Sequence, residues 1–162
     1  VSAHGAAAAA SHTGSLAGSG KIYDTAFQQG GVVRASDLNN LFDRTLALSL
    51  QPPMQGDNML IITNGGGVGV LATDAAERYG LPLRFAPADV QAELKKHMPE
   101  FGSAKNPVDL TGMAGKDWYY ASVRFAFAHS WVDGLAVLYC ETAMTDPLES
   151  PRASSRHWMM PG

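Results

Sequence analysis

Hydrophobic runs of strand length alternate with stretches of helical spacing along the middle of the chain. The runs 59–62 and 135–139 are continuously apolar, which is typical of strands buried on both faces of a sheet. The shorter runs Val32-Val33 and Leu83-Arg84-Phe85 predict two further strands. Strands that alternate with helices predict an α/β fold with a mostly parallel sheet.

Between these runs, apolar side chains recur at the spacing of amphipathic helices. Gly30-Gly31 and Gly80 are predicted to end two of the helices, and Ser36 is predicted to N-cap another. Residues 106–112 are predicted to form a loop. The predicted helices cover 21–29, 37–49, a stretch from Gly69 to about Tyr79, 89–98 and 117–128.

A composition shift divides the chain. The segment Gln51-Pro52-Pro53-Met54-Gln55-Gly56 is the best linker candidate, so residues 1–50 and 57–149 are expected to belong to different domains. Residues 150–162 change character abruptly and are expected to be a disordered or atypical tail. The tail and the start at Val1 suggest a piece of a longer protein.

Charge and cysteine content exclude several classes of function. With 12 Lys and Arg against 15 Asp and Glu, the net charge is −3, which argues against nucleic-acid binding. No stretch of 18 apolar residues predicts a membrane span, and the alanine run 6–10 lacks the basic region of a signal peptide. One cysteine, Cys140, excludes an internal disulfide, and a buried thiol is expected there. We expect a cytoplasmic protein.

The run 11–20 places His12 among small residues, which would leave its imidazole reachable. A reachable imidazole can act as a base, a nucleophile or a ligand. The alternative is a surface histidine in a flexible loop. Of the five histidines, only His4 and His12 have a spacing that a metal site could use, and a gap of eight residues is a weak signal, so no metal site is predicted.

A second candidate site is the turn 64–69, which joins an apolar strand to a helix. Its consecutive glycines would leave backbone N–H groups free at a helix N-terminus, which is the design of an anion site. The alternative is a tight turn without a ligand. The dinucleotide fingerprint G-x-G-x-x-G fails because Val70 stands where the last glycine is required, and the P-loop pattern fails at Ser15 and Ile22.

Five motifs in order resemble one family. The run 11–18 (Ser-His-Thr-Gly-Ser-Leu-Ala-Gly) resembles the phosphohistidine loop of NDP-forming acyl-CoA synthetases, the ADP-forming acetyl-CoA synthetase group related to succinyl-CoA synthetase. The run 23–27 and the motif formed by 31–34 and 37–43 fit the same family, as do 63–74 (Thr-Asn-Gly-Gly-Gly-Val-Gly-Val-Leu-Ala-Thr-Asp) and 106–110 (Asn-Pro-Val-Asp-Leu). The resemblance extends from about Gly5 to Thr142.

The resemblance implies flavodoxin-like CoA-ligase domains: the C-terminal part of the first in 1–50, with the phosphohistidine loop, and part of the second in 57–149. It implies CoA, ADP or ATP, and phosphate as substrates, with Mg²⁺ at a nucleotide domain outside this chain. The partners implied are CoA-binding and ATP-grasp domains of the same enzyme, in one chain or in a second subunit. An oligomer is also expected.

The implied reaction is acyl-CoA + NDP + phosphate ⇌ carboxylic acid + CoA + NTP, through a phosphohistidine. His12 would carry the phosphoryl group on a mobile loop. Asn106 and Asp109 would build a neighbouring loop. The acidic residue that orients the histidine in the family lies outside this chain. The residues expected to bind phosphate are Gly14, Asn64, Gly65, Gly66, Gly67 and Val68.

Two alternatives stay open. One is a non-catalytic regulatory or subunit-interface module derived from the family, and the other is an inactive fragment. In every case, the 162-residue chain alone is expected to have no synthetase activity, because its CoA-binding and nucleotide-binding regions would lie elsewhere.

Overall fold

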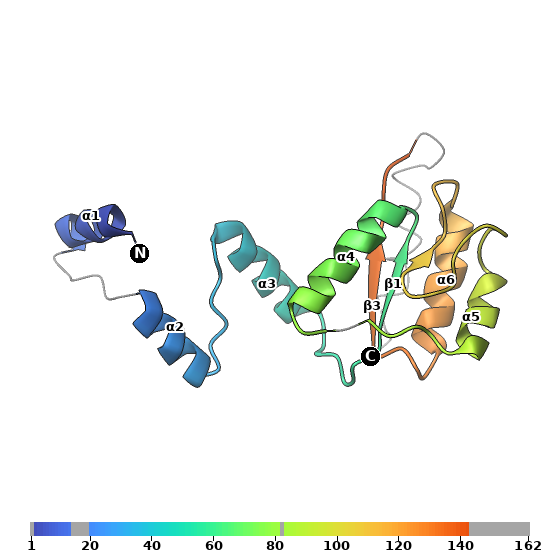
Figure 1. Ribbon diagram of the computed structural model, residues 1–162, viewed down its shortest axis with the longest axis horizontal. Coiled ribbons are helices and arrows are strands. Elements are labelled where there is room, and N and C mark those ends of the chain that lie inside the picture. The colour runs from blue at the N-terminus through green and yellow to red at the C-terminus, as the bar shows by residue number, and fades with distance from the viewer. Residues whose placement is uncertain (1, 14–19, 82, 143–162) are drawn as a thin grey trace. The chain divides into compact units, whose positions relative to one another are not determined.

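The computed structural model describes residues 2–13, 20–81 and 83–142, and the chain forms two compact units, 1–53 and 54–162. The boundary falls within the segment 51–56. Helices α1 to α3 belong to the first unit and all other elements to the second (Figure 1). The elements are α1 (Ala3–Thr13), α2 (Gly20–Gln29), α3 (Leu38–Leu50), β1 (Met59–Thr63), α4 (Gly66–Arg78), α5 (Ala88–Lys95), β2 (Val108–Asp109), α6 (Lys116–Ala128) and β3 (Gly134–Leu138).

The start of α3 differs from the prediction, because Asp37 rather than Ser36 is the N-cap residue. An Asp37 carboxylate oxygen accepts the backbone N–H of Asn40 at 2.9 Å, and the Ser36 hydroxyl donates to the same carboxylate at 2.7 Å. These two donors lower the pKa of Asp37 below its usual value. Ser36 therefore supports the cap and does not itself provide it.

Two further predictions in the first unit are wrong. Val32-Val33 is not a strand, because the described part of this unit offers no second strand for a ladder; Gly31, at φ +65°, turns the chain out of α2 just before it. The loop expected around His12 is instead helical at 11–13, which complete α1, and at Gly20, which begins α2; residues 14–19 lie outside the described residues. Alanine at 6–10 explains the helix at 11–13, since alanine has the highest helix propensity.

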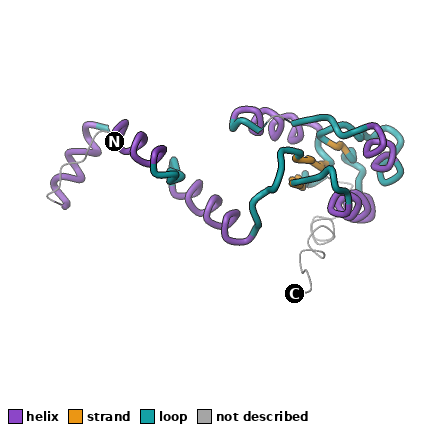
Figure 2. The backbone as a smooth tube through the Cα atoms, turned by 90° about the horizontal axis from the view of Figure 1, so that it is seen from below, coloured by secondary structure: helices purple, strands orange, loops and turns teal. Residues whose placement is uncertain are grey.

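The second unit is built on a parallel three-stranded sheet in the order β2-β1-β3. Ile62 pairs with Val108 on one side and with Val137 on the other. Helix α4 covers one face of the sheet, and α5 and α6 lie on the opposite face, as the two perpendicular views agree (Figures 1 and 2). The predicted α/β fold with a parallel sheet flanked by helices is confirmed.

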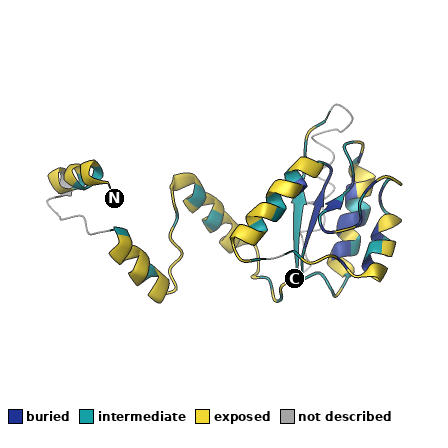
Figure 3. Cartoon of the chain, viewed as in Figure 1, coloured by how far each residue is buried: buried dark blue, intermediate teal, exposed yellow. Residues whose placement is uncertain are grey.

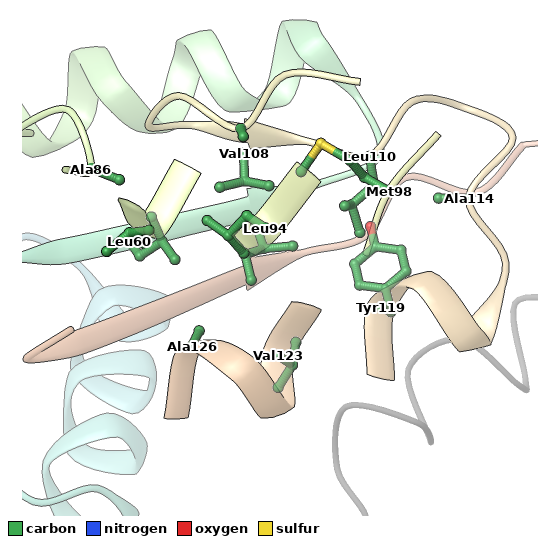
Figure 4. Packing of buried hydrophobic residues seen from close by; sticks show 13 residues of the cluster. Leu60, Ala86, Leu94, Met98, Val108, Leu110, Ala114, Tyr119, Val123 and Ala126 are labelled. Carbon is green, nitrogen blue, oxygen red and sulfur yellow. The ribbon is translucent and has the colours of Figure 1, made fainter. Parts of the chain in front are cut away.

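The core lies between the sheet and the pair α5 and α6. Leu60 and Ile62 of β1 face this side, where they join Val90, Leu94 and other buried residues in one cluster (Figures 3 and 4). Residues 60–63 of β1 are fully buried, as expected for a central strand covered on both faces. The prediction from the continuous apolar run is therefore confirmed.

Two predictions fail on the β2 side of the sheet. The predicted loop at 106–112 contains β2, and the predicted strand at 83–85 is absent. The contacts of the Asn106 side chain explain both differences, at 83–85 and at 106–112. Its amide nitrogen donates to the carbonyl oxygens of Arg84 (3.0 Å) and Met59 (2.6 Å), so it takes the place of a longer strand beside β1.

No helix in the described ranges combines the length and hydrophobicity that a membrane span requires.

Candidate functional site

The glycine-rich turn lies where β1 ends, at the carboxyl edge of the parallel sheet. In open α/β sheets, ligands bind at this edge. Gly65 is the N-cap residue of α4, with extended backbone, and the helix begins at Gly66. The strand-to-helix turn is thus built as the sequence indicates.

Three backbone N–H groups at the start of α4 are available to a ligand. Among the described residues, the structure gives no hydrogen-bond partner to the N–H groups of Gly66, Gly67 and Val68, whereas the N–H of Gly69 bonds to the carbonyl of Gly65 at 3.0 Å. Gly66 and Gly67 are exposed. Free N–H groups and the helix dipole together favour an anion here.

Gly65 differs from Gly66 and Gly67 in its hydrogen bonding and in its close packing. Its N–H already donates to the Thr63 hydroxyl at 3.0 Å, so it is not a free donor. A Cβ atom at position 65 would collide with Sγ of Cys140. Gly65 therefore shapes the turn by allowing the end of β3 to approach closely.

The Asn64 side chain is buried, and both its amide nitrogen and its amide oxygen form hydrogen bonds. Its amide nitrogen donates to the carbonyl of Cys140 at 2.8 Å, and its amide oxygen accepts the backbone N–H of Cys140 at 2.7 Å. The same oxygen accepts the Tyr119 hydroxyl at 2.9 Å. With these partners, Asn64 ties the turn to Cys140, two positions beyond the end of β3.

Tyr119 is a site residue that the sequence analysis did not identify, because its aromatic position in a predicted helix indicated packing alone. Its side chain is 1% exposed, and its hydroxyl lies within hydrogen-bond distance of Asn64 Oδ1 (2.9 Å) and of the Leu138 carbonyl (2.8 Å). Burial raises the pKa of this phenol far above its usual value, so it stays a donor at all ordinary pH.

A cleft of about 420 Å³ lies beside the first turns of α4. Its acidic wall includes Asp109, whose Oδ2 lies 3.1 Å from the position that a Cβ on Gly66 would take, and Asp74. The other Asp109 carboxylate oxygen accepts the N–H of Thr111 at 2.8 Å. A Cβ on Gly67, in contrast, would meet open space. An anion therefore reaches the helix start more favourably on the Gly67 side than on the Asp109 side.

The other predicted site residues have separate surroundings. His12 lies in the last turn of α1, in the first unit, and Gly14 lies outside the described residues. Cys140 is half-buried rather than fully buried as expected. Among the residues that the structure describes, no group of three or more His, Cys, Asp and Glu side chains could hold a metal ion.

Both units match family models. Residues 59–157, more than half of the chain, match the Ligase-CoA domain, and residues 1–48 match the succinyl-CoA ligase like flavodoxin domain. A similar protein is the acetate–CoA ligase [ADP-forming] I subunit alpha of Pyrococcus furiosus, 58% identical over 151 residues. That match covers 91% of this chain and 32% of the relative.

A second relative and a solved structure agree. The acetate–CoA ligase [ADP-forming] I of Archaeoglobus fulgidus is 39% identical over 146 residues, or 90% of this chain and 21% of the relative. The acetyl-coenzyme A synthetase 1 of Candidatus Korarchaeum cryptofilum, solved with phosphate and ADP, is 45% identical with a TM-score of 0.88 over 95% of this chain and 33% of that one. The chain thus spans between about a fifth and a third of the length of these three relatives, and it belongs to the Ligase-CoA domain family of ADP-forming acyl-CoA synthetases.

Proposed function

We propose that this chain is the phosphoryl-relay portion of an NDP-forming acyl-CoA synthetase. The observation that carries the proposal is the exposed start of α4, where three N–H groups have no partner among the described residues. The similarity to ADP-forming acetate–CoA ligases supports the reaction class. The reaction is acyl-CoA + NDP + phosphate ⇌ carboxylic acid + CoA + NTP.

In the proposed sequence, a phosphate oxygen attacks the thioester carbonyl and CoA leaves as the thiol, giving an acyl phosphate. A neutral imidazole nitrogen of His12 then attacks phosphorus, and the carboxylate leaves. A terminal NDP oxygen finally takes the phosphoryl group, which restores the free imidazole and yields NTP. Each step breaks one bond and forms one, so a single histidine suffices for a reversible relay.

The proposed role of α4 follows from charge. A phosphohistidine carries about two negative charges near neutral pH, and preorganised donors stabilise charge of this size. The N–H groups of Gly66, Gly67 and Val68 supply such donors. We propose that Gly14 and this turn bind phosphate while Asn64 and Gly65 shape the turn.

The remaining substrates are proposed to bind outside this chain. CoA and the nucleotide would be held by CoA-binding and ATP-grasp domains, in the same chain or in a partner subunit. Mg²⁺ is proposed to bind at the nucleotide domain, together with the nucleotide phosphates. The 162-residue chain alone is therefore expected to form neither acyl-CoA nor NTP.

The histidine assignment is tested in the intact synthetase that carries this sequence. The enzyme is incubated with acyl-CoA and radiolabelled phosphate, and acid-labile label on the protein is measured. His12→Ala should abolish this label, whereas His4→Ala, in the same helix, should retain it. Label that survives His12→Ala would exclude the assignment.

The helix assignment is tested with two substitutions at one position. Gly66→Pro removes one N–H donor at the first helical position, where proline is tolerated, and the preceding Gly65 already has the extended backbone that proline favours. Gly66→Ala adds a Cβ in the same place and keeps the N–H. The proline variant should bind inorganic phosphate about five- to tenfold more weakly than the alanine variant. Equal affinity would contradict a role for this donor.

A further inference from the structure

A buried polar junction, formed by hydrogen bonds, holds the turn at the start of α4 in place. Three segments meet there: the end of β1, the end of β3 and the first turns of α6. Asn64 lies just beyond the first, Cys140 just beyond the second, and Tyr119 within the third. Gly65 and the free N–H groups follow Asn64 directly along the chain, so the junction fixes the point from which they start.

The hydrogen bonds at Asn64 determine how its amide is oriented. The N–H of Cys140 requires the amide oxygen and the carbonyl of Cys140 requires the amide nitrogen, so the group cannot be flipped. The oxygen is therefore the acceptor that faces Tyr119, whose proton is shared between this oxygen and the Leu138 carbonyl. Figure 4 shows the Tyr119 ring rising from α6 with its oxygen directed toward the strands.

We propose that Tyr119 is a positioning residue: its hydroxyl, acting through Asn64, holds the turn so that the N–H groups of Gly66, Gly67 and Val68 point together at the phosphoryl group. This inference rests on the proposed function of the α4 start. It assigns the residue that sets the geometry of that site without touching the ligand. Loss of the hydroxyl would let the Asn64 side chain rotate about the two bonds to Cys140 that remain.

The test uses the 162-residue chain with inorganic phosphate as the probe. Binding is followed by the amide ¹H and ¹⁵N shifts of Gly66 and Gly67, and stability by thermal unfolding. Tyr119→Phe keeps the buried ring and removes only the hydroxyl. The expected result is a phosphate Kd about three- to tenfold higher than in the unmodified chain, the range set by the loss of one buried hydrogen bond.

A matched control lies one turn further along the same helix. The Ser122 hydroxyl is buried and donates to the His97 carbonyl at 3.0 Å, which ties α6 to the segment just beyond α5 rather than to the turn. Ser122→Ala should lower the unfolding temperature by a similar amount and leave the phosphate Kd unchanged. If both variants weaken phosphate equally, the effect is general destabilisation and the positioning role is overturned.

A second variant keeps the test decisive if Tyr119→Phe does not fold. Asn64→Ser removes the amide and leaves Tyr119 in place, and it should weaken phosphate binding at least as much. A Kd equal to that of the unmodified chain, in either folded variant, would overturn the inference alone. No phosphate-dependent shift in the unmodified chain would instead contradict the proposed function itself.

Discussion

The two units of the chain use their apolar side chains in opposite ways. In the first, helices α2 and α3 contain no buried residue; Leu38, Phe42 and Leu48 are each more than two-thirds exposed. In the second, α5 and α6 bury Leu94 and Tyr119 almost completely. The difference is the sheet: the second unit has one, whereas the described part of the first contains only helices.

The comparison shows that helices α2 and α3 of the first unit do not bury their apolar side chains, although their apolar residues have amphipathic spacing. A helix must bury its apolar stripe against another layer, and in α/β folds that layer is a sheet. The first unit has helices with apolar stripes, and the second unit has such helices together with a sheet that covers them. Substitutions that are equal in chemistry should therefore differ sharply in their effect on stability.

The largest contrast is expected for leucine truncation. Leu60→Ala removes a fully buried side chain from the central strand and should lower the free energy of unfolding by about 2–5 kcal/mol. Leu48→Ala, at a position 75% exposed, should change it by less than about 0.5 kcal/mol. Denaturant titrations followed by far-UV circular dichroism measure both. Equal losses would show that the first unit has a core of its own.

An asparagine pair gives the next largest contrast. Asn106→Ala would leave the Ile61 N–H and the carbonyls of Met59 and Arg84 without their side-chain partner, at a cost of about 3 kcal/mol. Asn39→Ala, on the exposed surface of α3, should be nearly neutral. The same titrations apply. A loss below about 1 kcal/mol for Asn106→Ala would mean that the ladder beside β1 does not depend on this amide.

A smaller effect is expected at Gly65, where crowding can be relieved. Gly65→Ala should destabilise the second unit by about 1–3 kcal/mol, because its Cβ meets the Cys140 side chain. Adding Cys140→Ala should recover part of that loss, since it removes the sulfur. A double-mutant cycle on thermal unfolding measures the coupling. Strict additivity of the two substitutions would contradict the contact.

The smallest effect concerns the cap of α3 in the first unit. Asp37→Ala should speed amide hydrogen exchange at Asn40 by about two- to tenfold, since that N–H loses its acceptor. Because the pKa of Asp37 is lowered in the folded state, its contribution is present at neutral pH and is lost as pH falls through that lowered pKa. Asp37→Asn, which keeps a capping oxygen, should abolish this pH dependence and keep most of the protection.

Sequence patterns predicted the elements that depend on their own residues. The run 59–62 and the helix over 117–128 were identified because burial and periodicity are local signals. Patterns failed where structure depends on a distant partner. Val32-Val33 has the composition of a strand without a neighbour in the described part of its unit, whereas Val108-Asp109 is a strand only because β1 lies beside it.

The candidate site divides along the same line. The free N–H groups of the α4 start follow from consecutive glycines after a buried strand, which the sequence displays. The hydrogen bond between Asn64 and Tyr119 could not be predicted in this way, because the two residues lie 55 positions apart and no local pattern links them. The role of His12 stays a prediction.

Both flanks of β1 are completed by an asparagine side chain: Asn106 beside its amino end and Asn64 just beyond its carboxyl end. A side-chain amide fits one alignment only, whereas two bare strands can slide by two residues and pair again. The two asparagine side chains therefore fix the number of residues between positions 59 and 64. Insertion or deletion of a residue within this interval would break one amide pairing or the other, so variation in chain length is expected to be confined to the segments outside it.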